Sequence, residues 1–241
     1  MATVAILPIK RFESAKSRLG AGAAPGAREA AASGAREVAA PGAREAAAPR
    51  AGEASPLCEA DATAGAAPAL ADAERASLAA SMAERVLDAL AAARRLDAVL
   101  VVTADPSARA AATAHGFEVV EEPVLAGHNA AAELGIARAL ELGATRALLV
   151  PGDCPLLSGD EVDGLLERHP GPGVVVVPDR HGTGTNALLL SPPDAIHPAF
   201  GPGSRDRHLG LAPAAVLDEV PGLLLDVDTP DDLAAVQRVS A

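Results

Sequence analysis

The sequence predicts an α/β fold, with a mostly parallel open sheet that carries helices on both faces. Short runs of Val, Leu, Ile and Ala, typical of buried strands, alternate with longer stretches in which apolar residues recur at helical spacing. Two of the most apolar runs lead into aspartates beside Gly or Pro, one at Asp153 and the other at Asp226 and Asp228. Ligands of open α/β sheets bind outside the carboxyl ends of the strands, so these aspartates mark the expected site.

The helices are predicted from apolar spacing and from residues typical of helix ends. Leu78, Met82 and Val86 recur at helical spacing and predict a long amphipathic helix over about 72–95. The series 158–161 is a capping box, and Pro230 after Thr229 is typical of a first helical position. Further helices are expected at about 106–115, 129–142, 158–168 and 204–211. Strands are expected at 1–7, 99–103, 117–120, 147–150, 174–177 and 187–190, with a last strand within 220–226.

A low-complexity insertion at about 20–70 is expected to interrupt a single domain that spans 1–241. The insertion consists of Ala, Gly, Pro, Arg and Glu, and Gly-Ala-Arg-Glu recurs within it with a period of eight. It has almost no large apolar residues, so burial cannot offset the entropy of ordering it. We therefore interpret it as disordered or loosely helical.

Composition excludes several classes of function. The net charge of −12 argues against nonspecific binding to nucleic acid and against an anionic membrane surface, because both need many cations. Cys58 and Cys154 have neither zinc spacing nor a disulfide framework. No apolar stretch reaches the length of about 18 residues that predicts a membrane span, and none resembles a signal sequence, so a cytoplasmic protein is expected. The sequence leaves a homodimer open.

A basic turn follows the first predicted strand. Lys10, Arg11, Lys16 and Arg18 place four cations within nine residues of an otherwise acidic chain. Turns after a first strand often bind phosphates in α/β proteins, although a solvated basic turn explains the pattern about as well. The turn contains neither a Walker sequence nor Gly-x-Gly-x-x-Gly, so a P-loop and a Rossmann dinucleotide site are not supported.

The aspartates are candidates for binding a metal ion. Asp226 and Asp228 alternate with Val227, so in a strand both carboxylates would point to one side and repel each other. A cation between them relieves the repulsion, and carboxylate oxygens suit Mg²⁺. The alternative is that the aspartates cap helices, which fits Asp153 less well because Ser158 already provides the next cap.

Two loops and one helix start are weaker candidates for binding. The Gly/Thr loop at 182–186 and the segment 200–204 before a short helix could each approach a small anion. Asn129 opens another helix, where it could act only as the N-cap.

Taken together, these segments resemble the guanylyltransferase family of coenzyme F-420 biosynthesis, whose members activate 2-phospho-L-lactate or phosphoenolpyruvate with GTP. The resemblance covers nearly the whole chain except the insertion, and it rests on the order and spacing of the motifs rather than on any one of them. The matching stretches are Pro8-Ile9-Lys10, Ala15-Lys16-Ser17-Arg18-Leu19, Ala73-Glu74-Arg75-Ala76-Ser77-Leu78-Ala79, Gly127-His128-Asn129-Ala130-Ala131, Gly152-Asp153-Cys154-Pro155-Leu156-Leu157, Gly182-Thr183-Gly184-Thr185-Asn186-Ala187-Leu188, Phe200-Gly201-Pro202-Gly203-Ser204 with His208, and Leu225-Asp226-Val227-Asp228-Thr229-Pro230-Asp231-Asp232-Leu233.

The resemblance implies a nucleotidyltransferase fold and a division of roles among the candidate residues. It implies that Lys16 and Asp153 are catalytic and that Mg²⁺ binds to the aspartates. The implied ligands and contacts are Asp153 and the pair Asp226 and Asp228 for the metal; Lys10, Lys16, Arg18, Gly127 and Asn129 for GTP; and Thr185, Asn186, Gly201 and Ser204 for the phosphorylated carboxylic acid. The sequence leaves open which of Asp226 and Asp228 contacts the metal. His128 departs from the family pattern, which usually has an apolar residue there.

The implied reaction joins the acid to the α-phosphate of GTP and releases pyrophosphate. The acceptor phosphate is already anionic, so the reaction needs positioning and charge neutralisation rather than a strong base. Two alternatives are a nucleotidyltransferase that acts on a sugar phosphate or molybdopterin, and a non-catalytic binding domain. Sequence alone leaves the choice between phosphoenolpyruvate and 2-phospholactate open.

Overall fold

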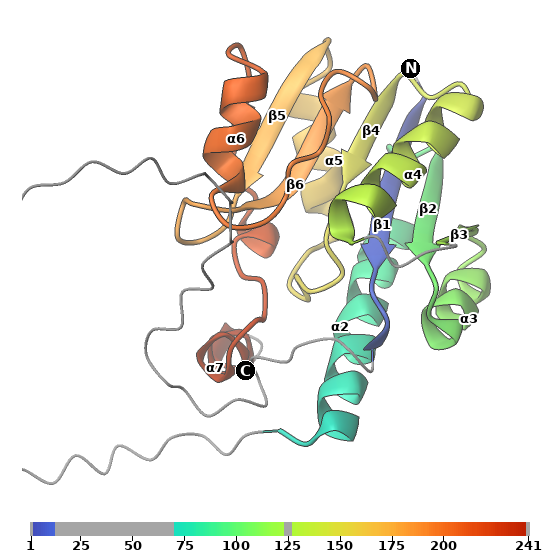
Figure 1. Ribbon diagram of the computed structural model, residues 1–241, viewed down its shortest axis with the longest axis vertical. Helices are drawn as coiled ribbons and strands as arrows, with labels where there is room; N and C mark the ends of the chain where they lie inside the picture. Colours follow the sequence, from blue (N-terminus) through green and yellow to red (C-terminus); the bar gives the residue numbers. More distant parts are fainter. Residues whose placement is uncertain (1, 13–69, 123–126, 240–241) are drawn as a thin grey trace, which may run out of the picture.

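A mixed sheet of seven strands forms the centre of the molecule, which confirms the predicted α/β class (Figure 1). The computed structural model describes residues 2–12, 70–122 and 127–239; most of the predicted insertion, with Lys16 and Arg18, lies outside them. The strand order is β3-β2-β1-β4-β6-β5-β7. The strands are β1 (Thr3–Ile9), β2 (Ala98–Thr103), β3 (Glu118–Glu121), β4 (Arg146–Leu149), β5 (Gly173–Pro178), β6 (Thr185–Ser191) and β7 (Val216–Leu217).

Strand direction decides which residues meet at the functional edge of the sheet. Among the seven described strands, β6 alone runs antiparallel to its neighbours, β4 and β5. The carboxyl ends of β1, β4 and β5 therefore lie at the same edge as the amino end of β6. That edge is where open α/β sheets bind ligands.

Helices cover both faces of the sheet, as predicted (Figure 1). Side chains alternate between the faces along each strand, so Leu7 packs in one apolar cluster and Ile6 in the other. Helices α2, α3, α5 and α7 contribute to the cluster that contains Leu7, and α4 and α6 pack in the cluster that contains Ile6. The helices are α2 (Asp72–Ala92), α3 (Pro106–Ala114), α4 (His128–Glu141), α5 (Gly159–Arg168), α6 (Ser204–Leu211), the 3-10 helix η2 (Pro221–Leu223) and α7 (Pro230–Val239).

The strand predicted within 220–226 is wrong, because this segment folds as η2 and an irregular stretch. Pro221 has no N–H for a ladder, and the Leu223 N–H turns back to the Val220 carbonyl at 2.8 Å. A Cβ on Gly222 would lie 2.6 Å from the Leu156 carbonyl oxygen, so the backbone lies directly against the chain after β4. The apolar run predicted a buried strand; Val220 and Leu223 are buried, but Leu224 and Leu225 are only half-buried and the backbone is not extended.

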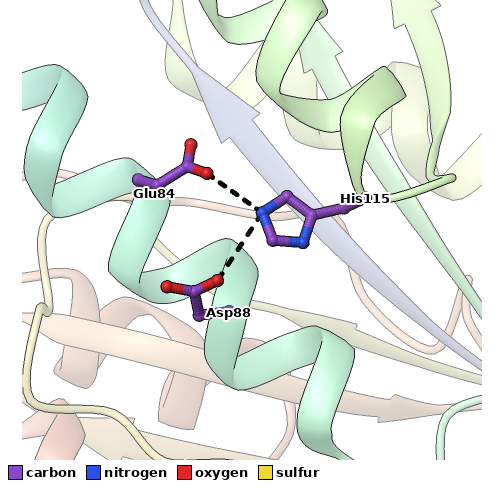
Figure 2. A group of neighbouring side chains, drawn as sticks. All are labelled: Glu84, Asp88 and His115. Atoms are coloured by element: carbon purple, nitrogen blue, oxygen red, sulfur yellow. Dashed lines mark hydrogen bonds and ion pairs between the residues drawn. The ribbon is translucent and has the colours of Figure 1, made fainter.

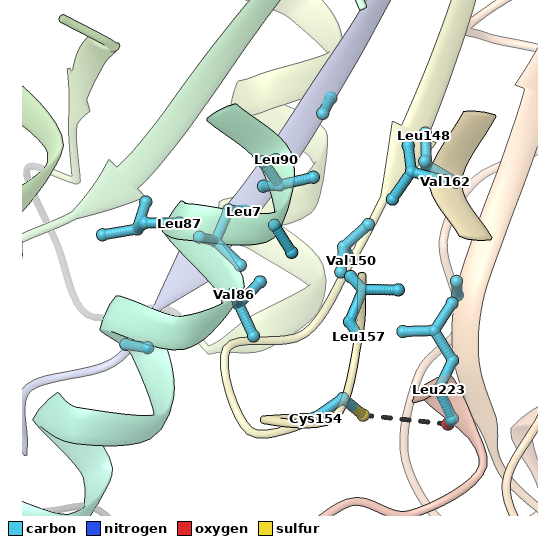
Figure 3. Packing of buried hydrophobic residues seen from close by; sticks show 14 of the residues in the cluster. Leu7, Val86, Leu87, Leu90, Leu148, Val150, Cys154, Leu157, Val162 and Leu223 are labelled. Atoms are coloured by element: carbon cyan, nitrogen blue, oxygen red, sulfur yellow. Dashed lines mark hydrogen bonds between the residues drawn. The ribbon is translucent and has the colours of Figure 1, made fainter. Parts of the chain in front are cut away.

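The larger apolar cluster reaches from α2 across the sheet to this segment (Figure 3). Leu7, Leu87 and Leu148 are fully buried within it. At its margin the Cys154 thiol donates to the Leu223 carbonyl at 3.7 Å, so the loop after β4 and the segment after η2 lie together. No helix in the described part of the chain is long and apolar enough to cross a membrane.

His115 links α2 to the end of α3 (Figure 2). Its Nε2 lies 3.2 Å from Glu84 Oε1 and 3.7 Å from Asp88 Oδ1, and its ring stacks on Phe117 at a centroid distance of 5.4 Å. Helix α3 begins near the carboxyl end of β2, and His115 lies at its far end. The cluster of His115, Glu84 and Asp88 therefore lies away from the functional edge. We interpret it as an electrostatic contact between two helices.

Asp105 fixes the path of the basic turn after β1. Its Oδ1 accepts from the N–H groups of Ser107 and Ala108, which caps α3, and its Oδ2 accepts from the Phe12 N–H at 3.0 Å. One buried carboxylate therefore joins the start of α3 to the turn that carries Lys10 and Arg11.

Asp105→Ala should lower the free energy of unfolding by about 2 kcal/mol, because both the helix cap and the bond to Phe12 are lost. Asp105→Asn is the matched control, since its Oδ1 still caps α3 while its amide group meets the Phe12 N–H. We expect Asn to cost about 1 kcal/mol in urea unfolding. Equal losses in the two variants would contradict a separate role for Oδ2.

Candidate active site

Three bonds hold η2 and the segment after it against the loop after β4 and the start of β6. The Val227 N–H donates to the Asp153 carbonyl at 3.1 Å, and the Asn186 amide donates to the Leu223 carbonyl at 2.6 Å. The Cys154 thiol bonds to the same Leu223 carbonyl (Figure 3). These bonds place the segment that carries Asp226 and Asp228 beside Asp153, although no strand leads into it.

The charges of Asp153 and Asp228 act on the carboxyl group of Asp226. Burial and, next, the charge of Asp153 raise the pKa of Asp226, and Asp228 adds to the rise. A hydrogen bond of 3.2 Å from the Asn186 amide opposes it. Three aspartate side chains thus lie close together, and the pKa of one of them, Asp226, is raised. Such a set of carboxylate oxygens suits a hard divalent cation.

A cavity of about 180 Å³ lies beside these acids, between the end of β1 and the start of α4. Burial and the charge of Lys10 lower the pKa of His128, while Asp153 raises it, so His128 lies close to both. The cavity is lined by Pro8, Ile9, Lys10, Arg11, Glu122, Gly127, His128 and Ala131.

Asn129 connects this cavity to the loop before α6. Its Oδ1 accepts from the Phe200 N–H at 2.7 Å, and its Nδ2 donates to the Phe200 carbonyl at 3.3 Å. Gly127, with φ of 100°, occupies the N-cap position of α4, so the predicted alternative of Asn129 as the N-cap is wrong. The Phe200 ring makes edge contacts with His128 and His208 at 4.8 and 5.2 Å between centroids.

The loop at 199–203 is held from α6. Arg207 donates from Nε to the Ala199 carbonyl at 3.0 Å and also bonds to the Pro202 carbonyl. Gly203 begins α6 in the left-handed region, with φ of 71°, where a side chain would be strained. Gly201 is exposed, whereas Ser204 is buried at the first turn of α6.

Thr185 and Asn186 begin β6, so the reversal of this strand brings them to the functional edge. Asn186 is buried, and its side-chain amide donates to the Leu223 carbonyl and to the Asp226 carboxylate. Its amide hydrogens therefore bond within the protein. Thr185 is half-buried, and its hydroxyl lies 2.9 Å from Nδ1 of His208. The site therefore gathers all the candidate residues that the structure describes along one edge.

Sequence reasoning missed the ion pair that fixes the start of α7. The carboxylate of Asp232 accepts from the N–H groups of Asp228 and Thr229 at 3.1 and 2.7 Å, and it pairs with Arg180. The Arg180 N–H in turn donates to the Leu224 carbonyl at 2.9 Å. Arg180 in the loop between β5 and β6 thereby supports the backbone of Asp228. An ion pair between residues this far apart leaves no signal in a single sequence.

Known proteins resemble this chain in sequence and in fold. Residues 56–237 match the family model described as "Guanylyl transferase CofC like". Proteins named phosphoenolpyruvate guanylyltransferase match from Conexibacter woesei, 40% identical over 100% of this chain and 90% of that protein, and from Sphaerobacter thermophilus, 35% identical over 97% and 91%.

Solved structures support the fold alone, because their sequence identities are low. A provisionally assigned nucleotide-diphospho-sugar transferase from Desulfovibrio desulfuricans G20 matches with a TM-score of 0.61 and 15% identity, over 100% of this chain and 88% of that chain. A nucleotidyl transferase from Methanothermobacter thermautotroptrophicus matches with a TM-score of 0.52 and 18% identity, over 66% and 79%.

Asp226→Asn should stabilise the metal-free protein by on the order of 1 kcal/mol, because it removes one of three mutually repelling charges and keeps the acceptor for Asn186. We expect added Mg²⁺ to raise the melting temperature of the wild type, and we expect the variant to lose most of this rise. Thermal unfolding with and without Mg²⁺ measures both effects. A variant less stable than the wild type without metal would contradict the repulsion.

His208 should make folding stability depend on pH. Burial, followed by the charge of Arg207, lowers the pKa of His208 to about 4. Between this value and the ordinary one near 6.5, the unfolded chain binds a proton that the folded chain does not. The free energy of unfolding should therefore rise with pH across this window, and His208→Asn should lack that part of the rise. His197→Asn, whose parent side chain is 92% exposed, is the control for the substitution itself.

Proposed function

The chain belongs to the family of CofC-like guanylyl transferases, and from that premise we propose that it condenses GTP with phosphoenolpyruvate in coenzyme F-420 biosynthesis. The relatives from C. woesei and S. thermophilus span almost the whole chain, and their names support phosphoenolpyruvate as the acceptor. The observation that carries the proposal is the meeting of Asp153, Asp226 and Asp228 beside Lys10 and His128.

In the proposed reaction, an oxygen of the phosphoenolpyruvate phosphate attacks the α-phosphorus of GTP. The bond between the α-phosphorus and the bridging oxygen to the β-phosphate breaks, and pyrophosphate leaves with that oxygen. The attacking oxygen is already deprotonated at neutral pH, so the protein has no proton to remove from it. The main barrier is the repulsion between two polyanions, which positioned charges can reduce.

The residues of the described edge divide this task. Asp153, Asp226 and Asp228 fit Mg²⁺, which when bound would supply charge neutralisation at the phosphates. Lys10 would face the triphosphate; Lys16 and Arg18 lie outside the described residues, and the family resemblance alone assigns them the same role. The cavity beside His128 would receive the nucleoside, with Gly127 and Asn129 at its border.

The substrate phosphoenolpyruvate would lie at the other end of the same edge of the sheet. Thr185, Gly201 and Ser204 would bind its carboxylate through hydroxyl and backbone groups. Asn186 would act through Asp226, because its amide hydrogens already bond to Leu223 and Asp226. The contact of Asn129 with Phe200 connects the nucleotide side to the acid side.

A competition assay tests the proposed acceptor. The protein is incubated with GTP, Mg²⁺ and equal concentrations of phosphoenolpyruvate and 2-phospho-L-lactate, and the products are separated by mass spectrometry. We expect the phosphoenolpyruvate adduct and pyrophosphate to dominate. Dominance of the phospholactate adduct would reassign the acceptor, and product formed only with a sugar phosphate would reject the function.

Asp153→Ala and Asp228→Ala should each lower kcat/KM by about a thousandfold or more, because several kcal/mol of charge stabilisation is lost. Circular dichroism should show an unchanged fold for both variants. Asp194→Ala, on an exposed loop, is the control and should retain full activity. Normal turnover of either site variant at saturating Mg²⁺ would reject the assigned metal ligands.

A further inference from the structure

His208 is a fully buried histidine whose two ring nitrogens both have hydrogen-bond partners. Its exposed fraction is 0%, although it lies on α6 beside two arginines. The Ala199 N–H points at Nε2 from 2.9 Å, and the Thr185 hydroxyl lies 2.9 Å from Nδ1. The ring therefore lies between the loop before α6 and the first residue of β6.

The contact with Ala199 assigns the position of the ring proton. A backbone N–H can only donate, so Nε2 must present its lone pair and the neutral ring carries its proton on Nδ1. Burial and the charge of Arg207 hold the pKa of His208 at about 4, which keeps the ring neutral at neutral pH. It follows that Nδ1–H donates to the Thr185 oxygen.

This donation sets the direction of the Thr185 hydroxyl. Because the Thr185 oxygen accepts from His208, its own hydrogen remains available to another acceptor. With the other tautomer, the Thr185 hydroxyl would have to donate to the ring and would present only lone pairs to a ligand.

We propose that His208 is a positioning residue that commits the Thr185 hydroxyl to donate to an anionic oxygen of the acid substrate. The proposal rests on the proposed function, which places the acid beside Thr185. A hydroxyl that presented lone pairs would repel a carboxylate, whereas a committed donor attracts it. The same ring anchors Ala199, so one side chain sets both the hydroxyl and the loop that carries Gly201.

Two amide variants separate these two contacts. In His208→Asn the amide nitrogen takes the place of Nδ1–H and still donates to Thr185, whereas the contact with Ala199 is lost. In His208→Gln the amide oxygen takes the place of Nε2 and still accepts from Ala199, whereas the donor to Thr185 is lost. Steady-state kinetics then measure KM for phosphoenolpyruvate and for GTP in each variant.

We expect His208→Gln to raise KM for phosphoenolpyruvate about tenfold or more and to change KM for GTP less than twofold. His208→Asn should keep KM for phosphoenolpyruvate within about threefold of the wild type. Thr185→Val should match His208→Gln, and the double variant should add nothing further. Equal effects of Asn and Gln, or a larger effect of Asn, would overturn the proposal in favour of a purely structural role.

The tautomer is measured on the wild-type protein, which guards against variants that fail to fold. Long-range ¹⁵N–¹H correlation spectra, assigned by comparison with His208→Asn, should show the proton on Nδ1 at neutral pH. A proton on Nε2 would overturn the proposal. If the wild type forms no product from GTP and phosphoenolpyruvate, the proposed function fails, whereas the spectrum tests the tautomer of His208 independently of turnover.

Discussion

The amide of Asn186 is the interaction on which the candidate site depends. It donates to the Leu223 carbonyl and to the Asp226 carboxylate, and so it connects η2 and the irregular segment after it to the start of β6. Without a strand of its own, that segment has no ladder to fix its register. Hydrogen bonds, rather than strand pairing, therefore position two of the three aspartates. Loss of a buried hydrogen bond of this kind lowers the free energy of unfolding.

Charge at the site differs from the charge of the whole molecule. The chain carries a net charge of −12, yet Lys10 and Asp153 both act on His128 at one end of the sheet. The positive charge of Lys10 suits phosphates, and the negative charge of Asp153 close by suits a cation. The raised pKa of Asp226 reflects a real cost of this arrangement, which is typical of functional sites. The net charge argues against nonspecific binding to nucleic acid or to an anionic membrane, but it does not describe the charges within such a site.

The sequence predicts most of the fold because burial and periodicity are local signals. The strands through β6 and the helices from α2 onward lie close to their expected bounds, since apolar runs and caps such as Ser158 mark them. The prediction for the segment 220–226 is wrong because burial beside Leu156 requires apolar residues whether or not the backbone is extended. The two-residue strand β7 is not predicted because it is too short to show a period and its two apolar residues are exposed.

The candidate site is predictable by residue type but not by contact. Aspartates after apolar runs identify the metal candidates, and the structure brings Asp153 close to Asp226. The roles of His208, Asp105 and Arg180 each depend on one partner at least 23 residues away in the chain. Such pairings are consequences of the sheet order and of the reversed β6, and neither can be read from one sequence.

The placement of Asp226 and Asp228 on a segment that follows the sheet has a consequence for biosynthesis. A growing chain emerges from its amino end, and domains generally begin to fold from that end during synthesis. Strands β1 to β6 can pair before residues 223–228 are made, whereas the aspartate cluster cannot form until they dock on β4 and β6. The nascent protein therefore passes through a stage in which its scaffold is built but its three acids have not yet been brought together.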